Sequence, residues 1–88
     1  MNISVLTPER ELYAGSITSV SVPGVEGRFQ LLRDHAPIIG ALVEGPVVIE
    51  RAGGQRIAFT IRRGIVEAND NEIALLVQGG EDFPAEEG

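Results

Sequence analysis

The chain has 88 residues, enough for one domain with a modest hydrophobic core, and its 13 acidic and 7 basic residues give a formal net charge of -6. Every basic residue is arginine, and the absence of lysine excludes Schiff-base and pyridoxal chemistry, a Walker-type phosphate loop, and lipoyl or biotinyl carriage. The absence of cysteine and the single histidine exclude disulfides, zinc–cysteine sites and multi-histidine metal sites, while the acidic balance argues against nucleic-acid binding.

Eleven glycines and five prolines interrupt the chain at short intervals, and the segments between them are rich in valine and isoleucine. This spacing is typical of many short strands, so the predicted fold is all-β, a flattened β-sandwich or barrel of about ten short strands. In chain order, we expect strands over 2–5, 11–14, 17–22, 28–32, 47–51, 56–62, 65–68 and 72–78, with 38–43 either a strand or one helical turn.

The third of these strands has an irregular hydrophobic pattern. Val20 and Val22 share one face, but Ile17 has the opposite parity. We therefore expect either a bulge near Ser19 or an exposed Ile17. The strand is predicted to end at Pro23–Gly24, because this dipeptide suits a type II turn.

The C-terminal half of the chain is expected to hold two hairpins and a tail. The first hairpin closes at 52–55, and the second closes at Asn69–Asn71, where Asn and Asp tolerate a left-handed backbone. After Gly79 the composition changes, since residues 80–88 include four acids and offer little to bury. We therefore predict a β-sandwich domain over 1–79 and an acidic, disordered tail over 80–88.

No group of residues resembles a catalytic, cofactor or metal site. His35 is the only histidine, no G-x-S-x-G elbow is present, and the paired glycines open no helix. The densest polar cluster surrounds His35 and contains Arg28, Arg33 and Asp34, on a segment that core packing does not explain. This cluster is the candidate contact surface. Arg62–Arg63 is either an exposed strand end or a contact for an acidic partner.

A series of motifs follows along the chain in order and without large gaps. They are Leu6-Thr7-Pro8-Glu9, Leu12-Tyr13-Ala14-Gly15, Val20-Ser21-Val22-Pro23-Gly24-Val25-Glu26-Gly27-Arg28-Phe29, His35-Ala36-Pro37-Ile38-Ile39, and Gly64-Ile65-Val66-Glu67-Ala68 followed by Asn71 and Ala74-Leu75-Leu76. Together they resemble the epsilon subunit of the F-type ATP synthase, in its N-terminal β-sandwich domain. The spacing of V-P-G-x-x-G from H-A-P is the most specific part of this resemblance.

The resemblance implies a non-catalytic rotor subunit of the central stalk without a cofactor. In the family, this sandwich holds the gamma subunit and rests on the polar loops of the c-ring, with alpha and beta as indirect partners. It thereby couples an ion gradient to ATP synthesis. The implied location is peripheral, at the cytoplasmic face of a bacterial inner membrane, without membrane insertion. By position, Arg28 falls where the family touches the c-ring, and Thr7, His35 and Gly40 fall in regions facing gamma or the ring.

Some positions depart from the family's pattern. Gln30 stands where glycine is usual, and Arg33–Asp34 stands where Pro-Gly is usual, so these residues join the candidate contacts by location alone. Full-length members continue into an inhibitory C-terminal helical hairpin, and we expect a naturally short subunit rather than a truncated one. The alternative function is a free-standing ligand- or peptide-binding sandwich. That function would need exposed aromatic residues, whereas Phe29 and Phe59 follow core parity.

Overall fold

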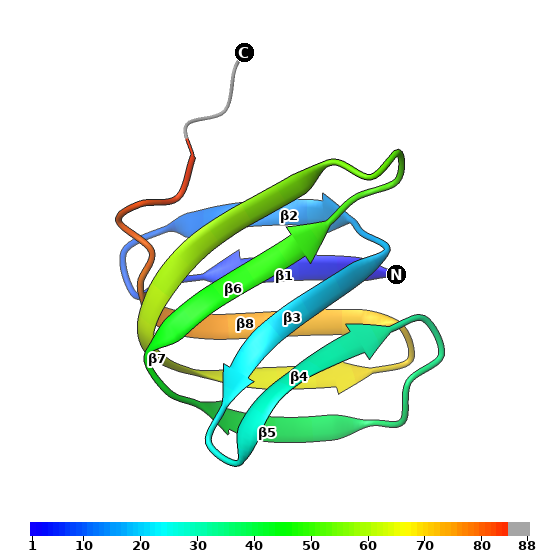
Figure 1. Ribbon diagram of the computed structural model, residues 1–88, viewed down its shortest axis with the longest axis horizontal. Helices are drawn as coiled ribbons and strands as arrows, with labels where there is room; N and C mark the ends of the chain where they lie inside the picture. Colours follow the sequence, from blue (N-terminus) through cyan, green and yellow to red (C-terminus); the bar gives the residue numbers. More distant parts are fainter. Residues whose placement is uncertain (85–88) are drawn as a thin grey trace.

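The structure of the protein is a computed structural model that describes residues 1–84 and contains eight strands in that range (Figure 1). The strands are β1 (Asn2–Leu6), β2 (Glu11–Ser16), β3 (Ser19–Gly24), β4 (Gly27–Leu32), β5 (Ile38–Leu42), β6 (Gly45–Glu50), β7 (Arg56–Asn69) and β8 (Glu72–Gly79). None of the described residues forms a helix long and apolar enough to cross a membrane. The predicted all-β fold is confirmed.

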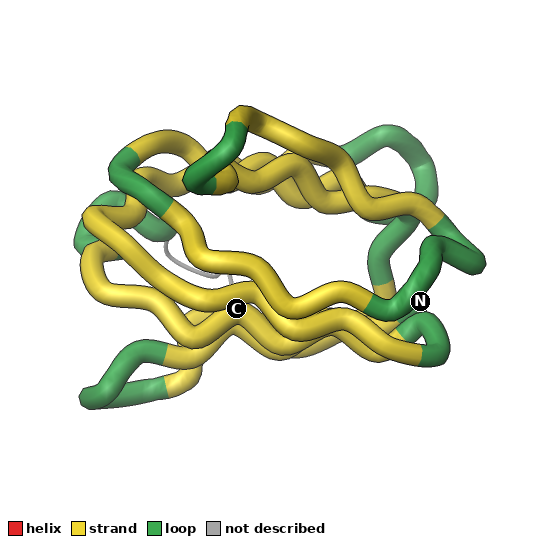
Figure 2. Tube along the Cα trace, turned by 90° about the horizontal axis from the view of Figure 1, so that it is seen from below, coloured by secondary structure: helices red, strands yellow, loops and turns green. Residues whose placement is uncertain are grey.

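The strands form two layers that face each other, as the edge-on view shows (Figure 2). One layer, called here the β6 layer, contains β4, β3, β6 and the first half of β7 in that order. The other, the β8 layer, contains β5, the second half of β7, β8, β1 and β2. All neighbouring strands run antiparallel except β1 and β8, which run parallel. The layers are joined by β7, which takes part in both, and by the pairing of Gly24 in β3 with Leu42 in β5.

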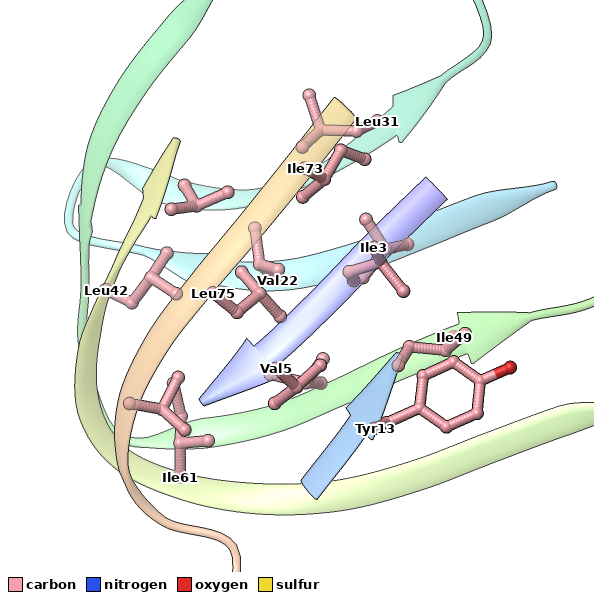
Figure 3. Packing of buried hydrophobic residues seen from close by; sticks show 14 of the residues in the cluster. Ile3, Val5, Tyr13, Val22, Leu31, Leu42, Ile49, Ile61, Ile73 and Leu75 are labelled. Atoms are coloured by element: carbon pink, nitrogen blue, oxygen red, sulfur yellow. The ribbon is translucent and has the colours of Figure 1, made fainter. Parts of the chain in front are cut away.

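The hydrophobic core fills the space between the two layers. Inward-facing aliphatic side chains come from both layers and interdigitate there (Figure 3). Fully buried members include Val5 and Leu75 from the β8 layer and Val20, Val47 and Phe59 from the β6 layer. The hydrophobic residues recur at every second position over much of each strand, and this alternation is the reason that the sequence pattern predicts a sandwich.

The long strand β7 corrects the predicted strand count. The sequence predicted separate strands over 56–62 and 65–68, but one strand spans both, which leaves eight strands rather than about ten. The register with β8 shifts between Ile61 and Arg63. This irregularity inserts one extra residue, so that the inward face moves from odd positions such as Phe59 to even positions such as Val66.

The irregular pattern around Ile17 has a different cause from the one predicted. Ile17 is 3% exposed and lies in the connection before β3, where its N–H donates to the Met1 carbonyl. The pairing of β3 is regular from Ser19 onward, so neither a bulge near Ser19 nor an exposed Ile17 occurs. Because Ile17 precedes the paired part of β3, its side chain need not follow the alternation of that strand.

The turn predicted at Pro23–Gly24 is also displaced. Both residues are buried inside β3, and Gly24 pairs with Gly27, so that Val25 and Glu26 make the turn. Gly27 takes the left-handed backbone that this tight connection requires, with φ of 125°. Pro23 has no N–H to donate, but its carbonyl still accepts a hydrogen bond from the Val43 N–H at 2.9 Å.

For 38–43 the sequence left a strand and a helical turn open, and the structure has a strand there, β5 (Ile38–Leu42). The two predicted hairpin loops are confirmed, at 51–55 and at 70–71. Asp70 and Asn71 have φ of 54° and 62°, the left-handed values expected for these residue types.

Residues 80–84, called here the strap, do not behave as the predicted disordered tail. The Gly80 N–H donates to the Thr60 carbonyl at 2.8 Å, and the Thr60 N–H donates to the Asp82 carboxylate at 2.8 Å. The Phe83 ring packs against Phe59, with ring centroids 5.1 Å apart. The strap is therefore attached to β7. The rest of the predicted tail, 85–88, lies outside the described residues.

Candidate functional site

Two of the predicted contact residues lie on the outer face of the β6 layer. Arg28 and Gln30 project from β4 into a shallow polar depression of about 240 Å³ that Ser21 and Val48 also line. The Arg28 Nη1 donates to the Pro46 carbonyl at 2.7 Å. β3 pairs with β6 only as far as Val48, so this carbonyl has no strand partner on that side and the guanidinium takes its place. This hydrogen bond uses one of the five guanidinium donors, and Arg28 is exposed.

Three further predicted residues, Arg33, Asp34 and His35, lie together in the loop between β4 and β5. Asp34 has a left-handed backbone with φ of 64°, and its side chain and main chain both bond Asn71. The Asp34 N–H donates to Asn71 Oδ1 at 2.7 Å, and Asn71 Nδ2 donates to Asp34 Oδ1 at 3.1 Å. This reciprocal pair, the Asp34–Asn71 clasp, joins the loop to the β7–β8 hairpin.

His35 is oriented by its own chain rather than by a catalytic partner. Its Nδ1 lies 2.8 Å from the Ala36 carbonyl, and since a carbonyl only accepts, this nitrogen is assigned the hydrogen. Its Nε2 is buried and has no hydrogen-bond partner among the described residues. His35 therefore has one ring nitrogen bonded to its own loop, while Nε2 has no partner among the described residues.

We expect the clasp to determine the conformation of this loop. Asn71→Ala removes both hydrogen bonds and forces alanine into a left-handed backbone, so a loss of about 1–3 kcal/mol of unfolding free energy is expected. Asn71→Gly removes the same bonds without the backbone penalty and separates the two contributions. Urea denaturation measures both variants. Equal stability of Asn71→Ala and the parent chain would contradict a structural role for the clasp.

Two predicted residues remain. Thr7 is distant from the clasp, and Gly40 has no side chain and faces inward. Thr7 follows β1, and its Oγ1 accepts from the N–H groups of Glu9 and Arg10 in the turn that leads to β2. The parallel register of β1 and β8 places Thr7 at the opposite end of the β8 layer from Asn71. Gly40 faces inward, because a Cβ there would lie 3.5 Å from Val66 Cγ1. The predicted site residues thus occupy several surfaces and do not form one cluster.

The structure also shows a surface that the sequence reasoning missed. Ala41, Ile65, Leu76 and Leu6 are cross-strand neighbours in consecutive strands of the β8 layer. They form a continuous line on its outer face, called here the apolar row. Ile65 is 49% exposed and Leu76 is 50% exposed, and nearby Ile39 is 74% exposed. The signal was available, because the unbroken apolar run 73–77 means that both faces of that strand are apolar.

A groove of about 460 Å³ runs beside the apolar row. Leu6, Ile65 and Leu76 line it together with Thr7 and Arg63. The groove is mostly apolar with a cation at its rim, which is the character of a protein-contact surface and not of a site for chemistry. By contrast, the four aromatic side chains of the chain are all buried or half-buried, so the described residues present no exposed aromatic platform.

Comparisons with known proteins agree on one family. The family described as "ATP synthase, Delta/Epsilon chain, beta-sandwich domain" matches residues 1–82. The ATP synthase epsilon chain of Leptospira borgpetersenii serovar Hardjo-bovis is 37% identical over 81 residues, covering 91% of this chain and 62% of the relative. The ATP synthase epsilon chain of Chlorobium limicola is 33% identical over 76 residues, covering 86% of each chain. The chain thus spans about three fifths of the length of the Leptospira relative.

A chain in the mitochondrial ATP synthase of Euglena gracilis has the same fold. Its structure, of an assembly described as OSCP/F1/c-ring, superposes with a TM-score of 0.80 at 17% sequence identity, over 85% of this chain and 48% of that one. A chain from the central stalk and c-ring of the Tetrahymena thermophila mitochondrial ATP synthase gives a TM-score of 0.72 at 20% identity, over 89% of this chain and 63% of that one. At these identities the likeness is one of fold.

Proposed function

Because this chain belongs to the family of ATP synthase delta and epsilon chains, in its β-sandwich domain, we propose that it is a rotor subunit of the central stalk of an ATP synthase. In this role it binds the gamma subunit, contacts the polar loops of the c-ring, and transmits torque between them. The role is mechanical and non-catalytic, with alpha and beta as indirect partners. The proposed location is peripheral, on the cytoplasmic face of a bacterial inner membrane.

The observation that carries this proposal is the apolar row. A line of exposed aliphatic side chains across several strands is unfavourable in water, so in an isolated sandwich it would have only a cost. Such a line marks a contact surface. An apolar row beside a mostly apolar groove that Arg63 also lines suits a permanent protein partner, and we assign this surface to gamma. Thr7 borders the same groove, which supports the placement of that residue at the gamma contact.

The c-ring contact is proposed for a different surface. Arg28 and Gln30 lie on the outer face of the β6 layer, which faces away from the apolar row. The remaining Arg28 donors suit carboxylate or carbonyl acceptors on polar loops. The loop of Arg33, Asp34 and His35 lies at one end of the sandwich, where it is accessible to either partner.

We expect Leu76→Asp to weaken binding to gamma from the same organism by about 30-fold or more, because a charge would be buried at the centre of the interface. Ala58→Asp is the matched control. It adds the same charge to an exposed strand position, but on the outer face of the β6 layer rather than of the β8 layer. Isothermal titration calorimetry measures both variants.

Retained affinity in Leu76→Asp with loss in Ala58→Asp would move the gamma contact to the other layer. Absence of binding by the parent chain at micromolar concentration would overturn the proposed function. Circular dichroism verifies that both variants keep the fold, which is expected because each replaced side chain is exposed.

A further inference from the structure

The first half of β7 has an edge that no strand covers. Residues 56–61 pair with β6 on one side, while the pairing with β8 on the other side begins only at Ile61. Within residues 1–84, no strand pairs with 56–60 on that second side. Such an edge presents free N–H and C=O groups to any other extended chain.

The strap occupies one end of this edge through one main-chain hydrogen bond and one side-chain acceptor. The Thr60 carbonyl accepts from the Gly80 N–H at 2.8 Å, and the Thr60 N–H donates to the two Asp82 carboxylate oxygens at 2.8 and 3.2 Å. Both main-chain groups of Thr60 therefore point away from β6. Because the outward groups of an antiparallel strand alternate, those of Ala58 and Arg56 point to the same side.

Aromatic packing holds the strap across the seam between the two layers. The Phe83 ring lies 5.1 Å from the Phe59 ring of β7 and 6.3 Å from the Tyr13 ring of β2, measured between centroids. Gly80 has φ of 78°, and a Cβ there would lie 2.7 Å from Leu12 Cδ1. The strap therefore fits its position closely, and its left-handed backbone at residue 80 favours glycine.

The strap's polar attachments are exposed. Asp82 is solvent-accessible, and the Thr60 N–H lowers the pKa of its carboxyl because the hydrogen bond favours the charged form. Glu81 forms an ion pair with Arg62 at 2.8 Å, and both side chains are largely exposed. Exposed attachments of this kind open locally at much lower cost than the core unfolds.

We propose that the strap is an edge guard, which prevents residues 56–60 of β7 from pairing with the same edge of a second copy of this chain. The edge sequence Arg-Ile-Ala-Phe-Thr is rich in residues that favour strands, and two identical antiparallel edges are complementary to each other. Release of the strap converts a monomer into an edge-to-edge dimer. The guard acts on a surface separate from the apolar row.

The test is a double variant of the full chain, Asp82→Ala with Phe83→Ala, which removes the carboxylate acceptor and the aromatic anchor. Glu81→Ala is the matched control, since it breaks only the exposed ion pair in the same segment. Amide hydrogen exchange at Thr60 reports release of the strap, and sedimentation equilibrium from micromolar to millimolar concentration reports dimer formation.

We expect Thr60 exchange to accelerate on the order of tenfold in the double variant, measured at the lowest concentration, and a dimer to form as concentration rises. The control is expected to match the parent chain in both measurements. Accelerated exchange in a chain that stays monomeric would overturn the guard role. Unchanged exchange at Thr60 would show that the strap does not hold this edge and would overturn the proposal at its first step.

Discussion

Replacing Phe59 with alanine is expected to lower the free energy of unfolding by about 3–5 kcal/mol, which is a large part of the stability of a domain this small. Phe59 is 2% exposed, and it is the largest of the fully buried side chains. It lies in the first half of β7, opposite Val47 of β6, and its ring also supports Phe83 of the strap. Its removal therefore leaves a cavity in the core and detaches the aromatic anchor together.

Phe29→Ala is the matched control, because Phe29 is also a strand phenylalanine but is only half-buried. For Phe29→Ala we expect a loss of unfolding free energy of about half the Phe59→Ala value or less. The reason is that folding removes less of the Phe29 side chain from water. Urea denaturation with both far-ultraviolet circular dichroism and tyrosine fluorescence measures the two variants. Equal losses would mean that burial in the core does not determine the effect.

The parts of this fold that were predictable are those determined by local chemistry. Alternation along Val47 and Ile49 specifies a half-buried strand, and Asp70 with Asn71 specifies a left-handed hairpin loop. The extra residue in β7 was not predictable, because a bulge depends on the pairing with β8 and two arginines at that point also suit a strand end. The strap was missed for the same reason. Its acidic composition indicates a tail, and only the unpaired edge of β7 gives Asp82 a partner.

The candidate site was predictable in part. Reasoning from charge found the loop of Asp34 and His35, but it did not find that Asn71, distant in sequence, holds that loop. The apolar row was missed because each of its members belongs to a different strand. A row of this kind exists only after the registers of β5, β7, β8 and β1 are known.

The two layers give the proposed stalk role a simple physical basis. The apolar row and the Arg28 depression lie on outer faces of opposite layers, with the hydrophobic core between them. The sandwich is 19 Å across in its thinnest dimension, and the continuous strand β7 connects its two layers. Because protein interiors are close-packed, we expect it to deform little under load. A force applied at one face is therefore delivered to the other with little loss to internal motion, which is the property that a torque-transmitting subunit requires.

Gly64 is the position where this continuous strand tolerates no side chain. It lies in β7 just after the irregularity, between Leu42 of β5 and Val77 of β8. A Cβ there would lie 2.8 Å from the Leu76 carbonyl oxygen and 2.9 Å from Val77 Cγ1. The carbonyl belongs to the backbone of the neighbouring strand, so β7 and β8 would have to separate. We expect Gly64→Ala to lower the unfolding free energy by about 3 kcal/mol.

Gly40→Ala is the control that separates lack of space from the general effect of replacing glycine. Gly40 also faces the core, from β5, but a Cβ there would lie 3.5 Å from Val66 Cγ1 and 3.9 Å from Phe29 Cζ, which is ordinary contact. The added methyl group restricts the unfolded chain, so a change between zero and a gain of about 0.5 kcal/mol is expected. Thermal and urea denaturation measure both variants. If Gly64→Ala proved as stable as Gly40→Ala, the close approach of β7 to β8 would not limit the strand, and the stiffness attributed to its crossing between layers would lose its structural basis.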